Sequence, residues 1–96
     1  MKIQSDSLKF TPSSDVASSV HENGIVLLHI GSGQMFASNV TGARIWSGLK
    51  GRQSTETIIG EISADYQIDL ATARGHVERF LIKLEQQKLI QREMPS

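Results

Sequence analysis

The Asn23-Gly24 pair constrains the fold of this chain most, because it marks a tight turn between two strand-like segments. Both residues tolerate positive φ, which a two-residue type I′ hairpin turn requires. The segments on either side are residues 16–20 and the aliphatic run 25–30. A second turn, residues 31–33, leads to a third strand-like segment, residues 34–38. The pattern therefore predicts an antiparallel meander of three strands.

From Asn39 onward, apolar residues recur at helical spacing and predict three helices. The first is capped by Asn39 or Thr41 and ends at Gly51, and the second begins at Ser54 or Thr55. The third, residues 69–87, is capped by Asp69 and carries the longest apolar stripe in the chain: Leu70, Ala73, Val77, Phe80, Leu81 and Leu84. Three strands followed by three helices predict an α+β fold in which the helices cover one face of the sheet.

Ninety-six residues, of which 39% are hydrophobic, allow one small domain. The N-terminal segment, residues 1–14, is polar, with four serines and Pro12. We expect it to be a flexible arm that contains a short strand at residues 8–10. We expect the folded domain to span residues 15–91 and the C-terminal residues 92–96 to be frayed.

Composition excludes several classes of protein. Ten basic and ten acidic residues leave no net charge at pH 7, so the chain lacks the positive field of most nucleic-acid binders. The absence of cysteine excludes disulfides and zinc–thiolate sites and favours a cytoplasmic location. No apolar run approaches the roughly 20 residues of a membrane span, and the N-terminus lacks the apolar region of a signal peptide. We expect neither a membrane nor a nucleic-acid partner.

The titratable residues form no catalytic or metal-binding pattern. If Asn23-Gly24 is a two-residue turn, His21 faces Val26 and His29 faces Ser18, so the two imidazoles are not cross-strand partners. The third histidine, His76, lies far along the chain on the last helix. We therefore expect no metal, no cofactor and no enzymatic activity in this chain.

Strand 34–38 contains neither proline nor a charged residue, the usual protections of a sheet edge. At an edge, its free N–H and C=O groups can pair with an extended peptide. The same edge can pair with a second copy, so both a monomer and an edge-paired homodimer are compatible with the sequence. By alternation, an inward-facing Phe36 places Met35 and Ala37 on the opposite face.

The segment from Gly33 to Trp46, GQMFASNVTGARIW, resembles the G-x-Y-x-x-L-N-x-T-G-A-x-I-W signature of PqqD-like proteins. Upstream, residues 24–28 resemble their G-x-V-L-L strand, and residues 77–84 with Leu89-Ile90 resemble their closing V-x-x-F-L-x-x-L…G-L-L. The resemblance runs from about Val16 to Ile90. The chain departs from the pattern at Ser38, where Leu is usual, at His76, where Asp is common, and at Lys88, where Gly is usual.

The resemblance implies a winged-helix-like domain that binds the leader part of a ribosomally made precursor peptide. It implies that the leader adds as a strand beside residues 34–38, against the third helix, and is presented to a radical-SAM enzyme or a leader protease. The lasso-peptide type is slightly closer than the pyrroloquinoline quinone type. The peptide-binding residues that we expect on this basis are Gln34, Met35, Phe36, Ala37 and Ser38 on the strand and Arg74, Val77, Glu78 and Leu81 on the helix.

Other interpretations of the third helix remain open. Arg74 and Glu78, with Leu81 beside them, also fit an exposed i,i+4 ion pair, while Leu70, Val77, Phe80 and Leu84 fit the core. Helix two, the turn at residues 67–68 and helix three also resemble a helix-turn-helix, so a DNA-binding winged helix is the alternative. Its contacts would be the mildly basic residues Arg74, His76, Arg79 and Lys83. We expect Trp46 to be a core anchor whose N–H finds a partner, and Gly42 to permit close packing at the start of the first helix.

Overall fold

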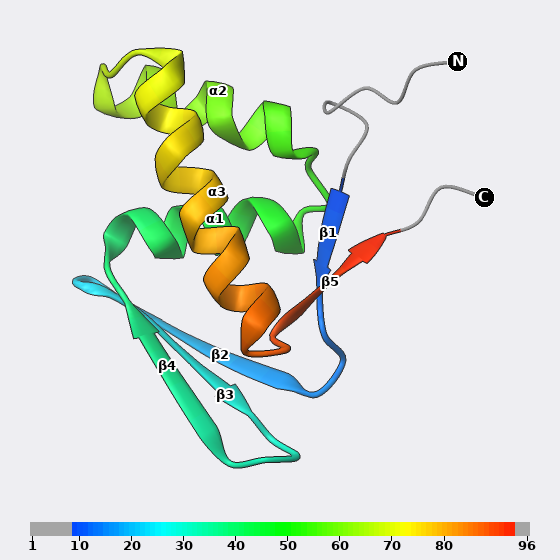
Figure 1. The fold of residues 1–96 in the computed structure, drawn as a ribbon. Helices are drawn as coiled ribbons and strands as arrows, with labels where there is room; N and C mark the ends of the chain where they lie inside the picture. The colour runs from blue at the N-terminus through cyan, green and yellow to red at the C-terminus, as the bar shows by residue number, and fades with distance from the viewer. Residues whose placement is uncertain (1–8, 94–96) are drawn as a thin grey trace, which may run out of the picture.

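The computed structural model describes residues 9–93, which form five strands and three helices (Figure 1). The strands are β1 (Lys9–Pro12), β2 (Val16–His21), β3 (Gly24–His29), β4 (Gln34–Ser38) and β5 (Ile90–Glu93). The helices are α1 (Val40–Lys50), α2 (Thr55–Tyr66) and α3 (Leu70–Gln86). The predicted meander is present as the antiparallel sheet β2-β3-β4, so the α+β prediction is confirmed.

The hairpin turn between β2 and β3 lies one residue earlier than predicted, which shifts the pairing of the two strands. His21 pairs with Gly24, so the two-residue loop is Glu22-Asn23 and not Asn23-Gly24. His29 therefore pairs with Val16 rather than Ser18. Gly24 has φ +152°, and a Cβ at this position would lie 2.1 Å from the carbonyl oxygen of Ser38. The glycine is thus required where β3 approaches the end of β4, and not inside the turn.

The three helices begin at three of the predicted caps. The side-chain oxygens of Asn39, Ser54 and Asp69 each accept a hydrogen bond from a backbone N–H in the first helical turn. These bonds satisfy donors that a helix start leaves without partners. The first helix ends at Lys50 with Gly51 as its C-cap, and the third spans one residue less at each end than the predicted range.

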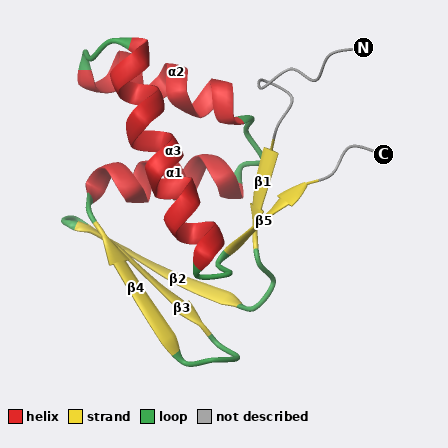
Figure 2. Ribbon diagram, viewed as in Figure 1, coloured by secondary structure: helices red, strands yellow, loops and turns green. Residues whose placement is uncertain are grey.

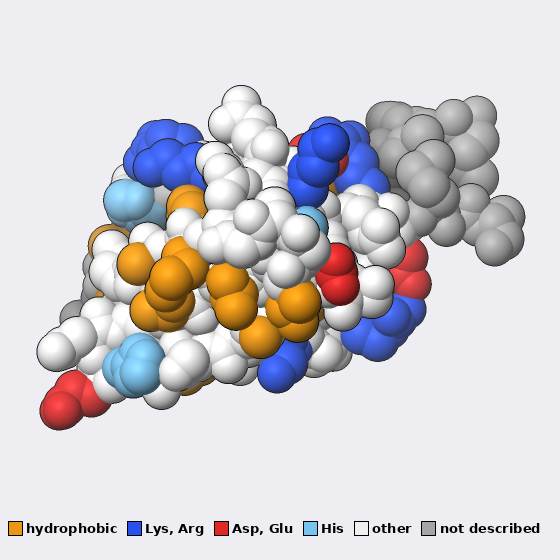
Figure 3. All heavy atoms as spheres, turned by 90° about the horizontal axis from the view of Figure 1, so that it is seen from below, with side chains coloured by type: hydrophobic (Ala, Val, Ile, Leu, Met, Phe, Trp, Pro, Cys, Tyr) orange, Lys and Arg blue, Asp and Glu red, His pale blue; other side chains and the backbone are white. Residues whose placement is uncertain are grey.

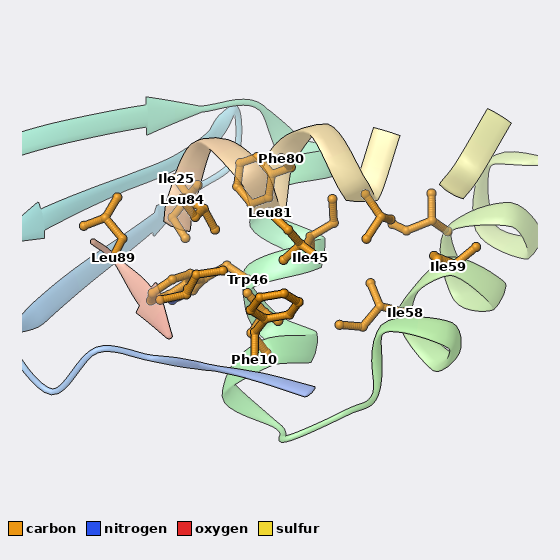
Figure 4. Packing of buried hydrophobic residues seen from close by; sticks show 14 of the residues in the cluster. Phe10, Ile25, Ile45, Trp46, Ile58, Ile59, Phe80, Leu81, Leu84 and Leu89 are labelled. Atoms are coloured by element: carbon orange, nitrogen blue, oxygen red, sulfur yellow. The ribbon is translucent and has the colours of Figure 1, made fainter. Parts of the chain in front are cut away.

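The helices lie together on one side of the sheet, and the core fills the space between them (Figures 1 and 2). Buried side chains from β1, β3, all three helices and the segment before β5 converge there, as Figure 4 shows for Phe10, Ile25, Trp46, Ile58, Leu84 and Leu89. The opposite face of the sheet is not covered by any described element. Figure 3 looks onto this face and shows hydrophobic side chains gathered at its centre.

Residues 9–12 and 90–93 form a second, two-stranded sheet, β1-β5. Phe10 is buried in the core, and the Arg92 guanidinium lies 5.6 Å from the centroid of its ring. β1 includes residues 9 and 10 of the strand predicted at 8–10 and continues through Pro12, and residues 92 and 93 pair with it in β5. The folded unit extends beyond the predicted 15–91. Residues 1–8 and 94–96 lie outside the described part of the chain.

Candidate peptide-binding site

β4 is an open edge of the three-stranded sheet. It pairs with β3 along its whole length, and no described element pairs with its other side. Phe36 is half-buried on the helix-facing side, opposite the fully buried Leu27, while Met35 is 70% exposed on the outer face. The predicted alternation is therefore correct. Every second residue of β4 directs its N–H and C=O away from β3, because successive residues of a strand alternate.

α3 borders this edge through Phe80. The ring centroids of Phe36 and Phe80 are 6.1 Å apart, and the rings are tilted by 54°. Gly42, at the start of α1, fits against both elements, since a Cβ there would lie 2.3 Å from Ser38 Oγ and 2.9 Å from Phe80 Cε1. The close packing predicted for Gly42 thus joins α1, the end of β4 and the middle of α3. An extended peptide added to β4 would lie beside an aromatic floor.

The predicted helix residues lie on the other flank of α3. Arg74, Glu78 and Leu81 line a cleft of about 210 Å³ whose other walls include Phe10, Glu56 and Arg92. Glu78 and Phe80 are two residues apart on a helix of 3.6 residues per turn, so their side chains point to nearly opposite sides. The structure therefore does not bring Arg74, Glu78 and Leu81 together with strand 34–38.

Arg74 is held in this second cleft by an ion pair with α2. Its Nη1 donates to Glu56 Oε2 at 2.6 Å and its Nη2 donates to Glu56 Oε1 at 2.9 Å. The hydrogen bonds to Glu56 hold the pKa of Arg74 above its ordinary value. Glu78 lies 4.0 Å away in the i,i+4 position. This geometry is that of a bidentate ion pair between helices, together with the i,i+4 pair that the sequence also allowed.

Val77 and Leu81 are core residues, 0% and 4% exposed. Of the predicted site residues, the structure thus places strand 34–38 at a sheet edge, and Arg74, Glu78 and Leu81 in the cleft on the other flank of α3. Phe80, which the apolar stripe predicted for the core, is 9% exposed there and is the α3 residue whose ring contacts Phe36. Its neighbours His76 and Lys83 lie one turn away on the same flank and are exposed.

The tryptophan lies in the core, and two of the histidines are held by local contacts and not in a grouped site within residues 9–93. The Trp46 side chain is 2% exposed, but its Nε1 has no hydrogen-bond partner within residues 9–93, so the prediction of a partner is wrong. The His29 ring is hydrogen-bonded to Ser32 and the His21 ring to Ser19. In the described part of the chain, no three His, Asp or Glu side chains are grouped as metal ligands would be. Within the same residues, no helix combines the length and the hydropathy of a membrane span.

Solved structures with this fold include proteins complexed with leader peptides. TbiB1, solved in complex with the TbiA(beta) leader peptide, is 32% identical, with a TM-score of 0.80 over 84% of this chain and 94% of that one. A lasso peptide synthetase B1 complexed with its leader peptide is 19% identical, with a TM-score of 0.79 over 86% of this chain and 98% of the other. These comparisons give no support to the DNA-binding alternative.

A third structure comes from Methylobacterium extorquens. It is the PqqD truncation of PqqCD, described as a functional, stand-alone recognition element for ribosomally synthesized and post-translationally modified peptides (RiPPs). It is 17% identical, with a TM-score of 0.73 over 94% of this chain and 95% of the other. No curated protein sequence matches the chain. The sequence model of coenzyme PQQ synthesis protein D matches residues 24–90, which include β3, β4, all three helices and the first residue of β5, and the chain therefore belongs to the PqqD family.

Proposed function

We propose that this chain binds the leader segment of a ribosomally made precursor peptide as an additional strand on β4. The observation that carries the proposal is the open edge of β4 beside the Phe36–Phe80 contact, in a chain 32% identical to TbiB1, a protein solved with a leader peptide. Strand addition supplies affinity through backbone hydrogen bonds, and side chains facing α3 supply specificity. The strand residues of the proposed site are Gln34, Met35, Phe36, Ala37 and Ser38.

We further infer that the chain is an adaptor and that the chemistry belongs to a partner enzyme. Leader binding of micromolar to nanomolar affinity corresponds to about 8–12 kcal/mol, within reach of a short peptide on one strand edge. An adaptor that also contacts the enzyme raises the effective concentration of the precursor there. Likeness to TbiB1 and to a lasso peptide synthetase B1 favours a leader protease over a radical-SAM enzyme as that partner. Such an adaptor would act in the cytoplasm, where precursors are translated.

The proposal also bears on the oligomeric state. A leader and a second copy of the chain would compete for the same backbone groups of β4. We infer that the leader-bound form is a monomer, and that any edge-paired dimer of the free chain dissociates when leader is added.

A pair of substitutions decides which flank of α3 the leader uses. Affinity is measured by calorimetry, with the leader of a precursor encoded beside the gene and with the TbiA(beta) leader as a second probe. Phe36→Ala, on the β4 flank, is expected to weaken binding about tenfold or more, since a buried aromatic contact is lost. Arg74→Ala, on the opposite flank, is expected to change it less than about twofold. The reverse pattern would move the site to the Arg74 cleft, and the absence of binding to either leader would contradict the proposed function.

A further inference from the structure

The two flanks of α3 differ in their charged residues. On the flank away from β4, Glu78 and Glu85 are accompanied by arginines: Arg74 lies 4.0 Å from Glu78, and Arg92 donates to Glu85 at 3.0 Å. On the flank toward β4 and along the exposed ridge beside it, the charged or titratable residues are His76, Arg79 and Lys83. This flank and ridge therefore carry no acidic residue, although acidic and basic residues balance in the chain as a whole. α3 thus separates a mixed flank from a basic one.

The basic residues on this flank have no acidic partner in the described residues. Four of the five arginines of the chain lie within 4.0 Å of a carboxylate, and Arg79 is the exception. The nearest polar contact of its Nη2 is His76 Nδ1, at 3.4 Å. Lys83 likewise forms no ion pair within residues 9–93. Two cations are therefore available for a ligand on the side of α3 that borders β4.

Their positions match the repeat of an added strand. His76 precedes Phe80 by four residues and Lys83 follows it by three, so both lie about one helical turn from the Phe36–Phe80 contact. One turn rises about 5.4 Å, and side chains on one face of a strand repeat about every 6.6–6.8 Å. In Figure 1, β4 and α3 run along similar lines, with opposite chain directions. If one residue of the added strand packs on Phe36 and Phe80, the residues two positions before and after it therefore lie beside His76 or Lys83.

We propose that the peptide bound at β4 carries an acidic side chain two residues from an apolar one, and that Lys83 and Arg79, with His76, select it. The inference rests on the proposed function and adds to it the chemical class of the peptide. The apolar residue would contact Phe36 and Phe80, and the carboxylate would replace the missing acidic partners of the cations. Each exposed pair contributes only about two- to fivefold in affinity, so selection comes from their sum and falls as salt rises.

The test is a selection that needs no known ligand. A displayed library of random 12-residue peptides is selected on the full chain, on Lys83→Glu, and on Lys50→Glu as a control with the same change in net charge. Lys50 is exposed near β2, at the opposite edge of the sheet, and has no ion pair within the described residues. We expect the wild type and Lys50→Glu to enrich Asp or Glu two positions from an apolar residue. We expect Lys83→Glu to lose that enrichment or to favour Lys and Arg instead.

A resynthesised peptide then gives the magnitude. Changing its acidic residue to Gln is expected to weaken binding to the wild type about threefold or more at ~50 mM salt and much less at ~500 mM. Peptides that bind through β4 with no acidic preference, or with the same preference in Lys83→Glu, would overturn the charge inference and leave the proposed function standing. Failure to enrich any peptide would overturn both.

Discussion

Lys88 adopts a conformation that a lysine rarely takes. Its φ is +62°, in the left-handed region, and it directly follows Gln87, the C-cap of α3. Its N–H donates to the Glu85 carbonyl at 3.0 Å and the next N–H, of Leu89, donates to the Leu84 carbonyl at 2.9 Å, which is the Schellman pattern of a helix end. The departure from the family glycine therefore leaves the left-handed helix end in place and adds strain at one residue.

Replacing Lys88 by glycine should stabilise the protein. A left-handed non-glycine residue costs roughly 1–2 kcal/mol, and the greater freedom of glycine in the unfolded chain offsets part of the gain. We expect Lys88→Gly to raise the free energy of unfolding by about 0.5–1 kcal/mol, measured by urea unfolding with the fluorescence of the single tryptophan. Lys88→Ala keeps the strain and is the control, with no gain expected. A lower stability for the glycine variant would mean that the left-handed turn is not strained.

Substituting alanine at two helical glycines should change the stability of the fold in opposite directions. A Cβ at Gly42 would lie 2.8 Å from Ser38 Cβ, whereas a Cβ at Gly60 would meet nothing within 4 Å. We expect Gly42→Ala to destabilise the fold by about 1–3 kcal/mol through overpacking and to weaken peptide binding by shifting β4 from α3. We expect Gly60→Ala to stabilise it by about 1 kcal/mol through helix propensity. Equal effects of the two substitutions in thermal unfolding would contradict the close contact at Gly42.

The start of α3 is capped by the Asp69 side chain. Asp69 Oδ1 accepts from the Thr72 N–H at 2.7 Å, and hydrogen bonds from Thr72, first from its side chain and then from its backbone, lower the pKa of Asp69 below its ordinary value of 3.8. Because the folded-state pKa is the lower one, this contribution to stability is present above about pH 4 and is lost as pH falls through the folded pKa.

Asp69→Asn keeps a capping oxygen but removes the charge. We expect it to be less stable than the wild type at pH 7 and expect the difference to shrink below pH 4, as Asp69 becomes protonated in the wild type. Circular dichroism during urea unfolding at pH 7, 5 and 3 measures this difference. The same difference at all three values would show that the charge of Asp69 does not contribute.

Most of these elements could be predicted from sequence because their signals are local. The caps, the stripe of α3 and the strand-like run 34–38 each depend on neighbouring residues. The hairpin register could not be predicted, since the place of Gly24 is set by a contact with Ser38, fourteen residues away. The sequence also could not predict which flank of α3 borders β4. An apolar stripe shows which face of a helix is buried, but not which neighbour lies on either side of it.

The β1-β5 pair closes the core with the two ends of the described chain. Neither strand has a strong sequence signal, since each has four residues and their partners are about eighty residues apart. Phe10 is 5% exposed among core residues that include Trp46 and Ile58 (Figure 4). The N-terminal strand is therefore part of the domain and not an appendage to it.

Removing the Phe10 side chain tests this closure. We expect Phe10→Ala to lower the free energy of unfolding by about 3 kcal/mol or more, the usual cost of a large cavity in a core. Lys9→Ala, which changes a half-buried neighbour on the same strand, is the control and should cost less than about 1 kcal/mol. A loss below 1 kcal/mol for Phe10→Ala in urea unfolding would show that β1 is dispensable.

Amide hydrogen exchange measured by NMR can show whether a leader peptide becomes a strand on β4. In the free protein, alternate amides of residues 34–38 have no partner strand and should exchange rapidly. With saturating leader, we expect these alternate amides to become protected and chemical shifts to change along β4 and the Phe80 flank of α3. Tight binding without new protection in β4, with shifts centred instead on Arg74 and Glu78, would contradict strand addition.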